Sequence, residues 1–329
     1  MNHSLQRPPA ADPLIAILGP TASGKSMLAV FLAQRLGGEV IACDSTQLYR
    51  GFDIGTAKPS ERERAGIPHH LIDVLDPPEA ATAGGYRDMA IRVLEDLRRR
   101  RKLPIFTVGT GLYFRALLDG LADVPQRSEE LRARLRQSAS EHEPGHLRRI
   151  LRRLDPEAAE KIAAADEQKL IRAIEVCLLA RRPISELHRS GRRALEGWHA
   201  IKIALQPERD KLYQRIHQRA GKMLDGGWLE EVGRLVASGA LEESKALDFI
   251  GYRELHRVLD GEMDIEQARM AIQQATRRYA KRQMTWFRRE TGVHRFAGFG
   301  DDAALQNDVL QVVERELADA ARGPEEGSV

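Results

Sequence analysis

Cysteine, long apolar runs and net charge are all scarce in this chain of 329 residues. Its two cysteines, Cys43 and Cys177, are too few for a disulfide framework and lack metal-ligand spacing with the histidines, so we expect a reducing compartment and no zinc site. No stretch approaches the roughly 18 apolar residues of a membrane helix. The formal net charge is only +3, so local clusters of charge indicate partners better than the total does.

The two ends of the chain are polar. Residues 1–11 are rich in proline and lack the apolar segment of a signal peptide. Residues 321–329 have the composition of a flexible tail. We therefore expect flexible termini, a cytoplasmic location and no membrane segment, and nothing in the chain implies a protein partner.

Short apolar segments alternate with helical patterns through the first third of the chain. The pattern predicts strands at residues 14–18, 39–43, 70–75 and 103–108, and helices at 26–36 and 86–102. Strands that alternate with helices are typical of a parallel, doubly wound sheet. We therefore predict an α/β fold.

The pattern changes after this region. Residues 128–190 show only helical periodicity, a strand is predicted again at 201–205, and helix follows to about residue 290. The predicted organisation is a P-loop NTPase-like parallel sheet core with C-terminal helices, formed by residues 12–121 and 199–292. An all-helical domain is inserted at 122–198.

A phosphate-binding motif follows the first predicted strand. The residues that match G-x-x-x-x-G-K-[ST] are Gly19, Pro20, Thr21, Ala22, Ser23, Gly24, Lys25 and Ser26. Backbone N–H groups of such a loop can cradle phosphate oxygens, Lys25 adds a point charge, and the Ser26 hydroxyl can hold Mg²⁺. The motif predicts a phosphate ligand but does not distinguish ATP from another diphosphate.

Two polar residues end predicted strands. Asp44 follows residues 39–43 directly, and Thr110 stands between two glycines after residues 103–108. Because carboxyl ends of parallel strands meet at one edge, we expect both beside the phosphate loop. Asp44 could then be a metal partner or a general base, or simply cap the next turn. The Thr110 hydroxyl could bond a substrate, or belong to a plain turn.

A basic stretch lies near the end of the predicted helices. Residues 269–289 contain seven arginines and lysines and no acid. Arg278 and Arg282 lie on one helical face, and Arg277 and Lys281 on another. This pattern predicts a cationic strip for a polyanion such as RNA, and the alternative is a solvated charged face.

Further segments complete an ordered set of motifs. They are Asp44-Ser-Thr-Gln-Leu-Tyr49, Ile54-Gly-Thr-Ala-Lys-Pro59, Pro68-His-His-Leu-Ile-Asp73, Gly109-Thr-Gly-Leu-Tyr113, Arg172-Ala-Ile-Glu-Val176, Leu212-Tyr-Gln-Arg-Ile216, Gly251-Tyr-Arg-Glu254 and a run from Thr276 to Phe287. With the phosphate loop, this set resembles the bacterial tRNA dimethylallyltransferases, which modify adenosine 37 beside the anticodon. The likeness covers residues 15–289. Two positions depart from the family pattern, Val108 for a glycine and Lys169 for an arginine.

The resemblance implies roles for individual residues. The phosphate loop would bind the diphosphate of dimethylallyl diphosphate, Asp44 would be the general base, Thr110 would lie near the scissile oxygen and the tRNA, and Arg219 would contact the diphosphate. The resemblance also implies a monomer and an inserted domain that binds the anticodon stem. The residues that match tRNA-contacting positions are Asp44, Ser45, Thr46, Gln47, Thr110, Arg132, Gln168, Lys169, Leu170, Ile171 and Arg172.

Other functions stay open from the residues alone. A small-molecule P-loop kinase would use the same loop and Asp44, but it leaves the acid-free basic stretch without a role. An RNA-binding switch protein without group transfer would use the basic stretch but not Asp44 or Thr110. Isoprenyl transfer to a free adenine nucleotide would need neither the insertion nor the basic stretch.

Overall fold

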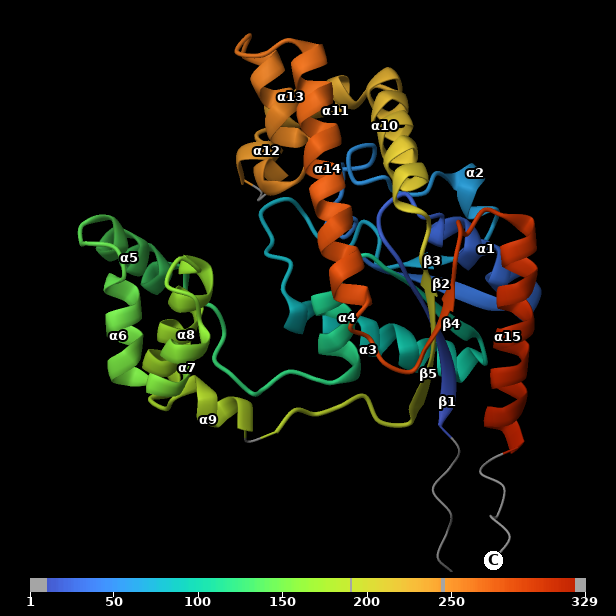
Figure 1. Cartoon of the computed structure of the whole chain (residues 1–329), viewed down its shortest axis with the longest axis horizontal. Helices are drawn as coiled ribbons and strands as arrows, with labels where there is room; N and C mark the ends of the chain where they lie inside the picture. The colour runs from blue at the N-terminus through green and yellow to red at the C-terminus, as the bar shows by residue number, and fades with distance from the viewer. Residues whose placement is uncertain (1–10, 190, 244–245, 323–329) are drawn as a thin grey trace, which may run out of the picture. The chain divides into compact units, whose positions relative to one another are not determined.

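The computed structural model describes residues 11–189, 191–243 and 246–322 (Figure 1). The chain forms two compact units, one made of residues 118–195 and the other of the remainder. The predicted insertion, 122–198, starts and ends a few residues later than the observed smaller unit. The predicted flexible residues 1–10 and 323–329 lie outside the described part.

A parallel sheet forms the centre of the larger unit. Its strands are β1 (Asp12–Leu18), β2 (Gly38–Cys43), β3 (His69–His70), β4 (Leu103–Val108), β5 (Trp198–Leu205) and β6 (Val293–Phe296). Their order is β3-β2-β4-β1-β5-β6 and every pairing is parallel. Ile15 of β1 pairs with Ile105 on one side and Ile201 on the other. The predicted α/β fold class is confirmed.

Helices surround this sheet. They are α1 (Lys25–Leu36), α2 (Glu61–Arg64), α3 (Ala83–Arg100), α4 (Gly111–Leu118), α10 (Arg209–Asp225), α11 (Trp228–Ala237), α12 (Ala240–Glu243), η1 (Ala246–Asp248), α13 (Tyr252–Leu259), α14 (Ile265–Phe287) and α15 (Ala303–Arg322). No helix in the described residues has both the length and the apolar character that crossing a membrane demands.

Apolar periodicity explains how the helices cover the sheet. Leu28 and Leu32 of α1 and Val309 of α15 are fully buried and form one cluster with Ile15 and Ile17 of β1. The helical residues recur at four-residue spacing, which keeps them on one face. A second cluster joins α10, α11, α13 and α14 around Trp228 and Tyr252. The sheet and this helical layer together form the walls of the candidate site.

The smaller unit has its own core. It contains α5 (Glu129–Ser140), α6 (His146–Leu154), α7 (Pro156–Lys161), α8 (Glu167–Ala180) and α9 (Ile184–Arg189). Leu135, Leu151 and Ile174 are buried together at its centre. The helical character predicted for residues 128–190 is confirmed for 128–189, and residue 190 lies outside the described part.

The predicted strand at residues 70–75 is wrong beyond its first residue. β3 ends at His70, and Leu71 and Asp73 have φ angles of 60° and 56°, which interrupt a strand. The N–H groups of Val74 and Leu75 instead donate to the carbonyl of Leu48. The apolar residues of this segment therefore pack along a loop, which explains their strand-like pattern.

The core extends beyond the predicted limit of residue 292. β6 adds an edge strand and α15 reaches Arg322, so the predicted tail from residue 321 begins too early. β6 was missed because its four residues, Val-His-Arg-Phe, carry little apolar pattern. α15 does carry a signal, since Leu305, Val309 and Val313 are buried at helical spacing.

Candidate active site

The loop between β1 and α1 has the form that phosphate binding requires. It leaves the carboxyl end of an interior strand and opens directly into α1, so backbone N–H groups and a helix N-terminus meet there. Lys25 Nζ donates to the carbonyls of Gly19 and Pro20 at 2.8 and 2.9 Å. Ser23 Oγ is buried without a hydrogen-bond partner. The loop therefore holds a cation and an unsatisfied hydroxyl.

A cavity of about 780 Å³ lies against this loop. The predicted phosphate-binding residues that line it are Thr21, Ala22, Ser23, Gly24, Lys25 and Ser26. Gly19 and Pro20 lie outside the lining and contribute the carbonyls that hold Lys25. Asp44, Gln47 and Arg219 also line the cavity, so the sheet edge and α10 contribute to one site.

Two half-buried cations, Lys25 and Arg219, favour an anion here. The Arg219 guanidinium donates to Thr21 Oγ1. Burial lowers the pKa of Lys25 to about 8, which the Asp44 carboxylate opposes and the charge of Arg219 reinforces. Burial also lowers the pKa of Arg219. An anion bound between the two side chains would offset these costs.

Asp44 and Thr110 lie together at the ends of neighbouring strands, as predicted. Thr110 Oγ1 accepts a hydrogen bond from the Ser45 N–H at 3.1 Å. Asp44 Oδ1 accepts from the N–H and hydroxyl of Thr46, at 3.0 and 2.7 Å. A Cβ atom on Gly109 would lie 2.5 Å from Asp44 Oδ2, so any larger residue here would push the carboxylate aside. Asp44 is thus held in place with its second oxygen beside the turn.

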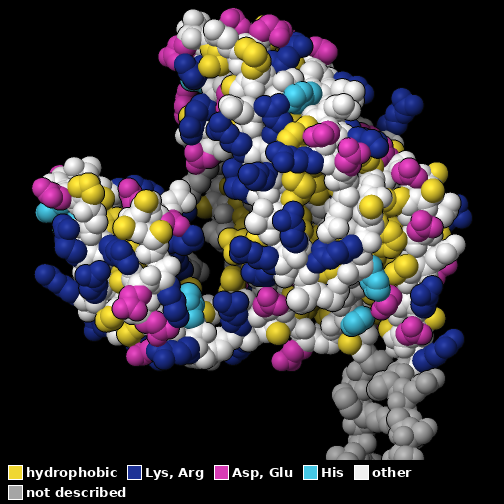
Figure 2. All heavy atoms as spheres, in the orientation of Figure 1, with side chains coloured by type: hydrophobic (Ala, Val, Ile, Leu, Met, Phe, Trp, Pro, Cys, Tyr) yellow, Lys and Arg dark blue, Asp and Glu magenta, His cyan; other side chains and the backbone are white. Residues whose placement is uncertain are grey.

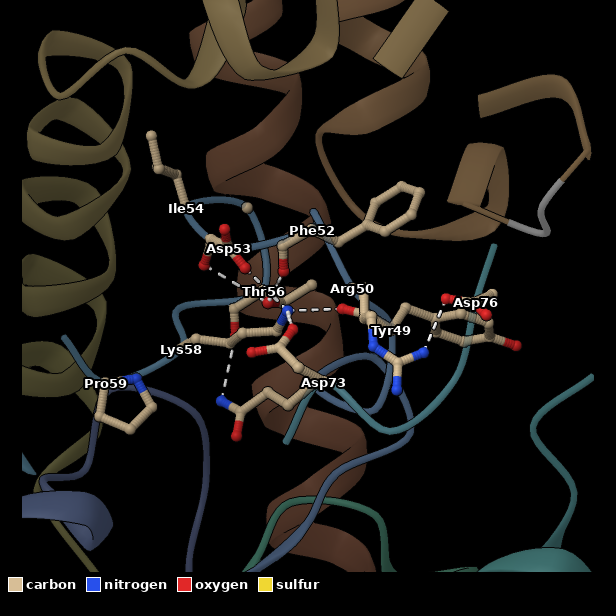
Figure 3. Close-up of polar contacts among 12 residues, drawn as sticks. Tyr49, Arg50, Phe52, Asp53, Ile54, Thr56, Lys58, Pro59, Asp73 and Asp76 are labelled. Atoms are coloured by element: carbon tan, nitrogen blue, oxygen red, sulfur yellow. Dashed lines mark hydrogen bonds and ion pairs between the residues drawn. The ribbon is translucent and has the colours of Figure 1, made fainter. Parts of the chain in front are cut away.

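The 52–59 loop forms another wall, and Lys58 organises it (Figure 3). The Lys58 side chain is only 4% exposed. Its ammonium donates to the Tyr49 carbonyl and to the carboxylates of Asp53, at 2.8 Å, and Asp73. Asp73, the last residue of the Pro68–Asp73 motif, is therefore paired with a protein cation.

A buried carboxylate fixes the same loop from the helical layer. Glu231 of α11 is 2% exposed and accepts from three consecutive N–H groups, those of Asp53, Ile54 and Gly55, at 2.7 to 3.2 Å. The Tyr252 hydroxyl also donates to it, at 2.8 Å. Because this loop is held from both sides, its contribution to the cavity wall is preorganised.

A second cavity of about 300 Å³ continues from the first. The residues that line both are Thr21, Asp44, Thr56, Ala57, Arg219, Met223 and Tyr279. About half of its other lining is apolar, including Ile216, Trp228, Phe249 and Ile272. The site therefore joins a cationic phosphate region to an apolar region, with Asp44 at the junction.

The predicted cationic strip lies on α14. Arg278, Lys281 and Arg282 are exposed, and Figure 2 shows Lys and Arg side chains gathered over the part of the larger unit that α14 occupies in Figure 1. Arg277 differs from them, because its guanidinium contacts His217 Nε2 at 2.5 Å. Arg282 also lies over the ring of Tyr279, 5.7 Å from its centre. Three of the four predicted side chains are thus open to a polyanion.

The predicted tRNA-contacting residues of the smaller unit differ in their exposure. Gln168 and Lys169 are exposed and Arg172 is half-buried, but Leu170 and Ile171 belong to the apolar core, so their side chains do not face a ligand. The Arg132 side chain is 13% exposed and its Nε donates to Glu175 at 3.1 Å. The side chains of Leu170 and Ile171 therefore serve the core of the smaller unit, and that of Arg132 is largely occupied by Glu175.

Sequence reasoning missed residues of α14 and of the segment after β6. Gln283 and Tyr279, on the buried face of α14, reach the Gly109 carbonyl at 2.9 and 3.4 Å. The Gly300 N–H donates to the Ser23 carbonyl at 2.9 Å, and Asp301 forms an ion pair with Arg215. Of these residues, only Tyr279 and Gln283 belong to a motif recognised in the sequence, the run from Thr276 to Phe287. That run was interpreted through its basic residues alone.

This fold and site define a P-loop enzyme whose phosphate region adjoins an apolar pocket. The family model described as IPP transferase matches residues 47–290, and one described as isopentenyl transferase matches residues 13–73. The chain belongs to the IPP transferase family.

Individual relatives agree with this assignment. A protein of Koribacter versatilis named tRNA dimethylallyltransferase is 52% identical, over 92% of this chain and 99% of its own. One of the same name from Solibacter usitatus is 45% identical, over 93% and 99%. The crystal structure of a full-length tRNA isopentenylpyrophosphate transferase from Bacillus halodurans is 35% identical, with a TM-score of 0.70 over 94% of this chain and 98% of that one.

Proposed function

We propose that this protein is a cytoplasmic tRNA dimethylallyltransferase. It transfers the dimethylallyl group of dimethylallyl diphosphate to the exocyclic amine of adenosine 37 in tRNA and releases diphosphate. The observation that carries the proposal is the pair of joined cavities, one cationic and one apolar, that share Asp44 and Arg219. A prenyl diphosphate is both a polyanion and a short hydrocarbon. The names of the curated relatives support tRNA as the acceptor.

The chemistry is a displacement at the allylic carbon. The carbon–oxygen bond to the diphosphate breaks while the exocyclic nitrogen forms a bond to the same carbon. The nitrogen is a weak nucleophile, because its lone pair is delocalised into the ring, and it loses a proton as the bond forms. Asp44 accepts this proton, since its carboxylate lies at the junction of the cavities and Thr46 already fixes its other oxygen.

Negative charge develops on the leaving diphosphate. Lys25, Arg219 and the loop N–H groups stabilise this charge, because they line the cavity before the reaction begins. Thr110 lies at the same edge without lining either cavity, and its hydroxyl accepts from the N–H of Ser45, which lines the second cavity. These groups act from fixed positions, so little reorganisation accompanies the reaction.

Magnesium fits the donor set at this loop. Within the described residues there is no cluster of His, Cys, Asp and Glu that could hold a metal alone, and the exposed Ser26 hydroxyl lines the phosphate cavity. Mg²⁺ commonly binds through one protein oxygen, waters and substrate phosphates. Ser26 would hold the ion against the diphosphate, where it supplies further charge stabilisation.

Transfer of label tests the proposal directly. Purified protein is incubated with radioactive dimethylallyl diphosphate, unmodified tRNA and Mg²⁺, beside an Asp44→Ala variant and a reaction with ATP alone. We expect label in the tRNA that Asp44→Ala reduces at least about 100-fold. Tight tRNA binding without label would favour the switch protein, and turnover of ATP would favour a kinase.

A further inference from the structure

Gln283 connects the two loops that carry the proposed chemistry. Its side chain comes from α14 and is 6% exposed. Its Oε1 accepts from the Thr21 N–H at 2.8 Å, and its Nε2 donates to the Gly109 carbonyl at 2.9 Å. A primary amide has one acceptor end and one donor end, so these partners use both ends and fix its orientation.

The two partners belong to different loops of the site, and both line the phosphate cavity. Thr21 is part of the phosphate loop and receives the Arg219 guanidinium on its hydroxyl. Gly109 belongs to the turn that contacts Asp44 and precedes Thr110. The amide of Gln283 therefore joins the phosphate loop to the turn beside Asp44.

The separation between the phosphate loop and the turn beside Asp44 affects the displacement step more than the binding of either substrate. Small misplacement of reacting groups lowers rates strongly, because the bound geometry must be close to that of attack. Removal of the amide leaves the phosphate cations in place on α1 and α10, and leaves the exposed cations of α14 unchanged. It releases only the tie between the loops.

The position of Gln283 on α14 adds a second consequence. Arg282, its neighbour in the chain, lies on the exposed cationic face, while Gln283 lies on the buried face. One rigid helix therefore carries the proposed tRNA contacts on one side and the tie between the two loops on the other.

We propose that Gln283 is a positioning residue, which sets the separation between the phosphate loop and the Asp44–Thr110 edge for the transfer step. The proposal rests on the transferase function. Gln283 also lines the phosphate cavity, and the role proposed for it is exerted through its hydrogen bonds to Thr21 and Gly109.

Kinetics of Gln283→Met and Gln283→Asn test the proposal. Methionine has a similar volume but no amide, and asparagine keeps the amide but is too short to span both partners. We expect kcat to fall roughly 10- to 100-fold in both variants, with KM for tRNA and for dimethylallyl diphosphate within about threefold of wild type. The exposed Gln274 of the same helix provides matched controls, Gln274→Met and Gln274→Asn, which should retain the wild-type rate.

A double-mutant cycle separates positioning from a general loss of packing. If Gln283 acts through the turn at Gly109, the effect of Gln283→Met should shrink to less than about threefold in a Thr110→Val background. A merely structural role predicts independent effects. Wild-type kcat in both Gln283 variants, or fully additive effects, would overturn the proposal.

Amide hydrogen exchange gives a readout that needs no transfer. The Thr21 N–H should exchange faster in Gln283→Met than in wild type or Gln274→Met, because it loses its acceptor. Unchanged exchange would also overturn the proposal. Absence of label in tRNA with the wild-type protein would instead refute the transferase function, and exchange alone would then decide whether Gln283 holds the two loops.

Discussion

Two groups of basic side chains in this protein have the same chemistry and opposite surroundings. On α14, Arg278, Lys281 and Arg282 are exposed within a 21-residue stretch that contains no acid. In the smaller unit, Arg132 and Arg172 surround Glu175, whose side chain is fully buried. The first group is available to a partner molecule, and the second is largely committed to its own unit.

The Glu175 site shows how a buried acid changes the meaning of an arginine. Its carboxylate accepts from Arg132 Nε at 3.1 Å, from Arg172 at 2.6 Å and from the Ser128 N–H at 2.8 Å. Burial by itself raises the pKa of Glu175, but these hydrogen bonds outweigh it and lower the pKa. A basic residue thus indicates an RNA contact only where no buried acid competes for it.

The largest expected effect comes from removing that acid. Glu175→Ala leaves Arg132 and Arg172 without their carboxylate and opens a cavity, so the smaller unit should lose about 3–5 kcal/mol of unfolding free energy. Urea unfolding monitored by circular dichroism measures this. Glu160→Ala, an exposed site in the same unit, provides the control and should change stability by less than about 0.5 kcal/mol. Equal effects of the two substitutions would contradict the inference that Arg132 and Arg172 stabilise their own unit through Glu175.

Neutralising α14 should give the converse result. The triple change of Arg278, Lys281 and Arg282 to Gln should weaken tRNA binding roughly 10- to 100-fold, and reduce the slope of log affinity against log salt by about 2. The unfolding free energy should stay within about 1 kcal/mol, because these side chains are exposed. Filter binding over a range of salt concentrations provides the measurement. An unchanged slope would mean that α14 is a solvated face.

Glu39, another buried acid paired with an arginine, extends the comparison to the pH dependence of stability. Glu39 of β2 accepts two hydrogen bonds from Arg100 and contacts His70, and together these partners lower its pKa to about 2 against the opposing effect of burial. Its pKa in the unfolded chain is near 4.5. The folded form therefore binds fewer protons, so this stabilisation is complete above about pH 4.5 and declines as the pH falls towards 2.

Glu39→Gln tests this pH dependence. The variant should be about 1–3 kcal/mol less stable than wild type at pH 7, and the difference should narrow as the pH is lowered from about 4.5 towards 2. Thermal melts across this range provide the measurement. A constant difference between the two proteins at all pH values would show that Arg100 and His70 do not set the pKa of Glu39.

The same comparison explains what the sequence could predict. The phosphate loop, Asp44 and Thr110 follow apolar strands directly, and parallel strands bring their carboxyl ends together, so local pattern was sufficient for the edge of the site. The acid-free stretch predicted the exposed cations of α14 in the same way. Both signals lie within a few consecutive residues.

Contacts between distant segments could not be predicted in this manner. Glu231 meets the 52–59 loop, Gln283 meets Thr21 and Gly109, and the Gly300 N–H meets Ser23, each across more than a hundred residues. Arg132 and Arg172 matched a family pattern, but only the folded unit reveals Glu175 between them. β6 was missed because a short, polar edge strand carries little periodicity.

Lys169 gives the smallest expected effect. It is paired with an acid, like the arginines around Glu175, but it is exposed, like the cations of α14. Its ammonium pairs with Asp166, yet 72% of its side chain is exposed, so this ion pair stabilises little and does not withhold the cation from RNA. The family pattern carries arginine here, and a guanidinium can contact a phosphate through two hydrogen bonds where an ammonium acts as a point charge.

Lys169→Arg should therefore tighten tRNA binding by roughly two- to threefold. Binding isotherms at one salt concentration can resolve this change. Lys161→Arg, an exposed lysine of the same unit that is also paired with an acid, should change nothing. Weaker binding by Lys169→Arg would mean that this end of α8 packs closely against a ligand that fits lysine.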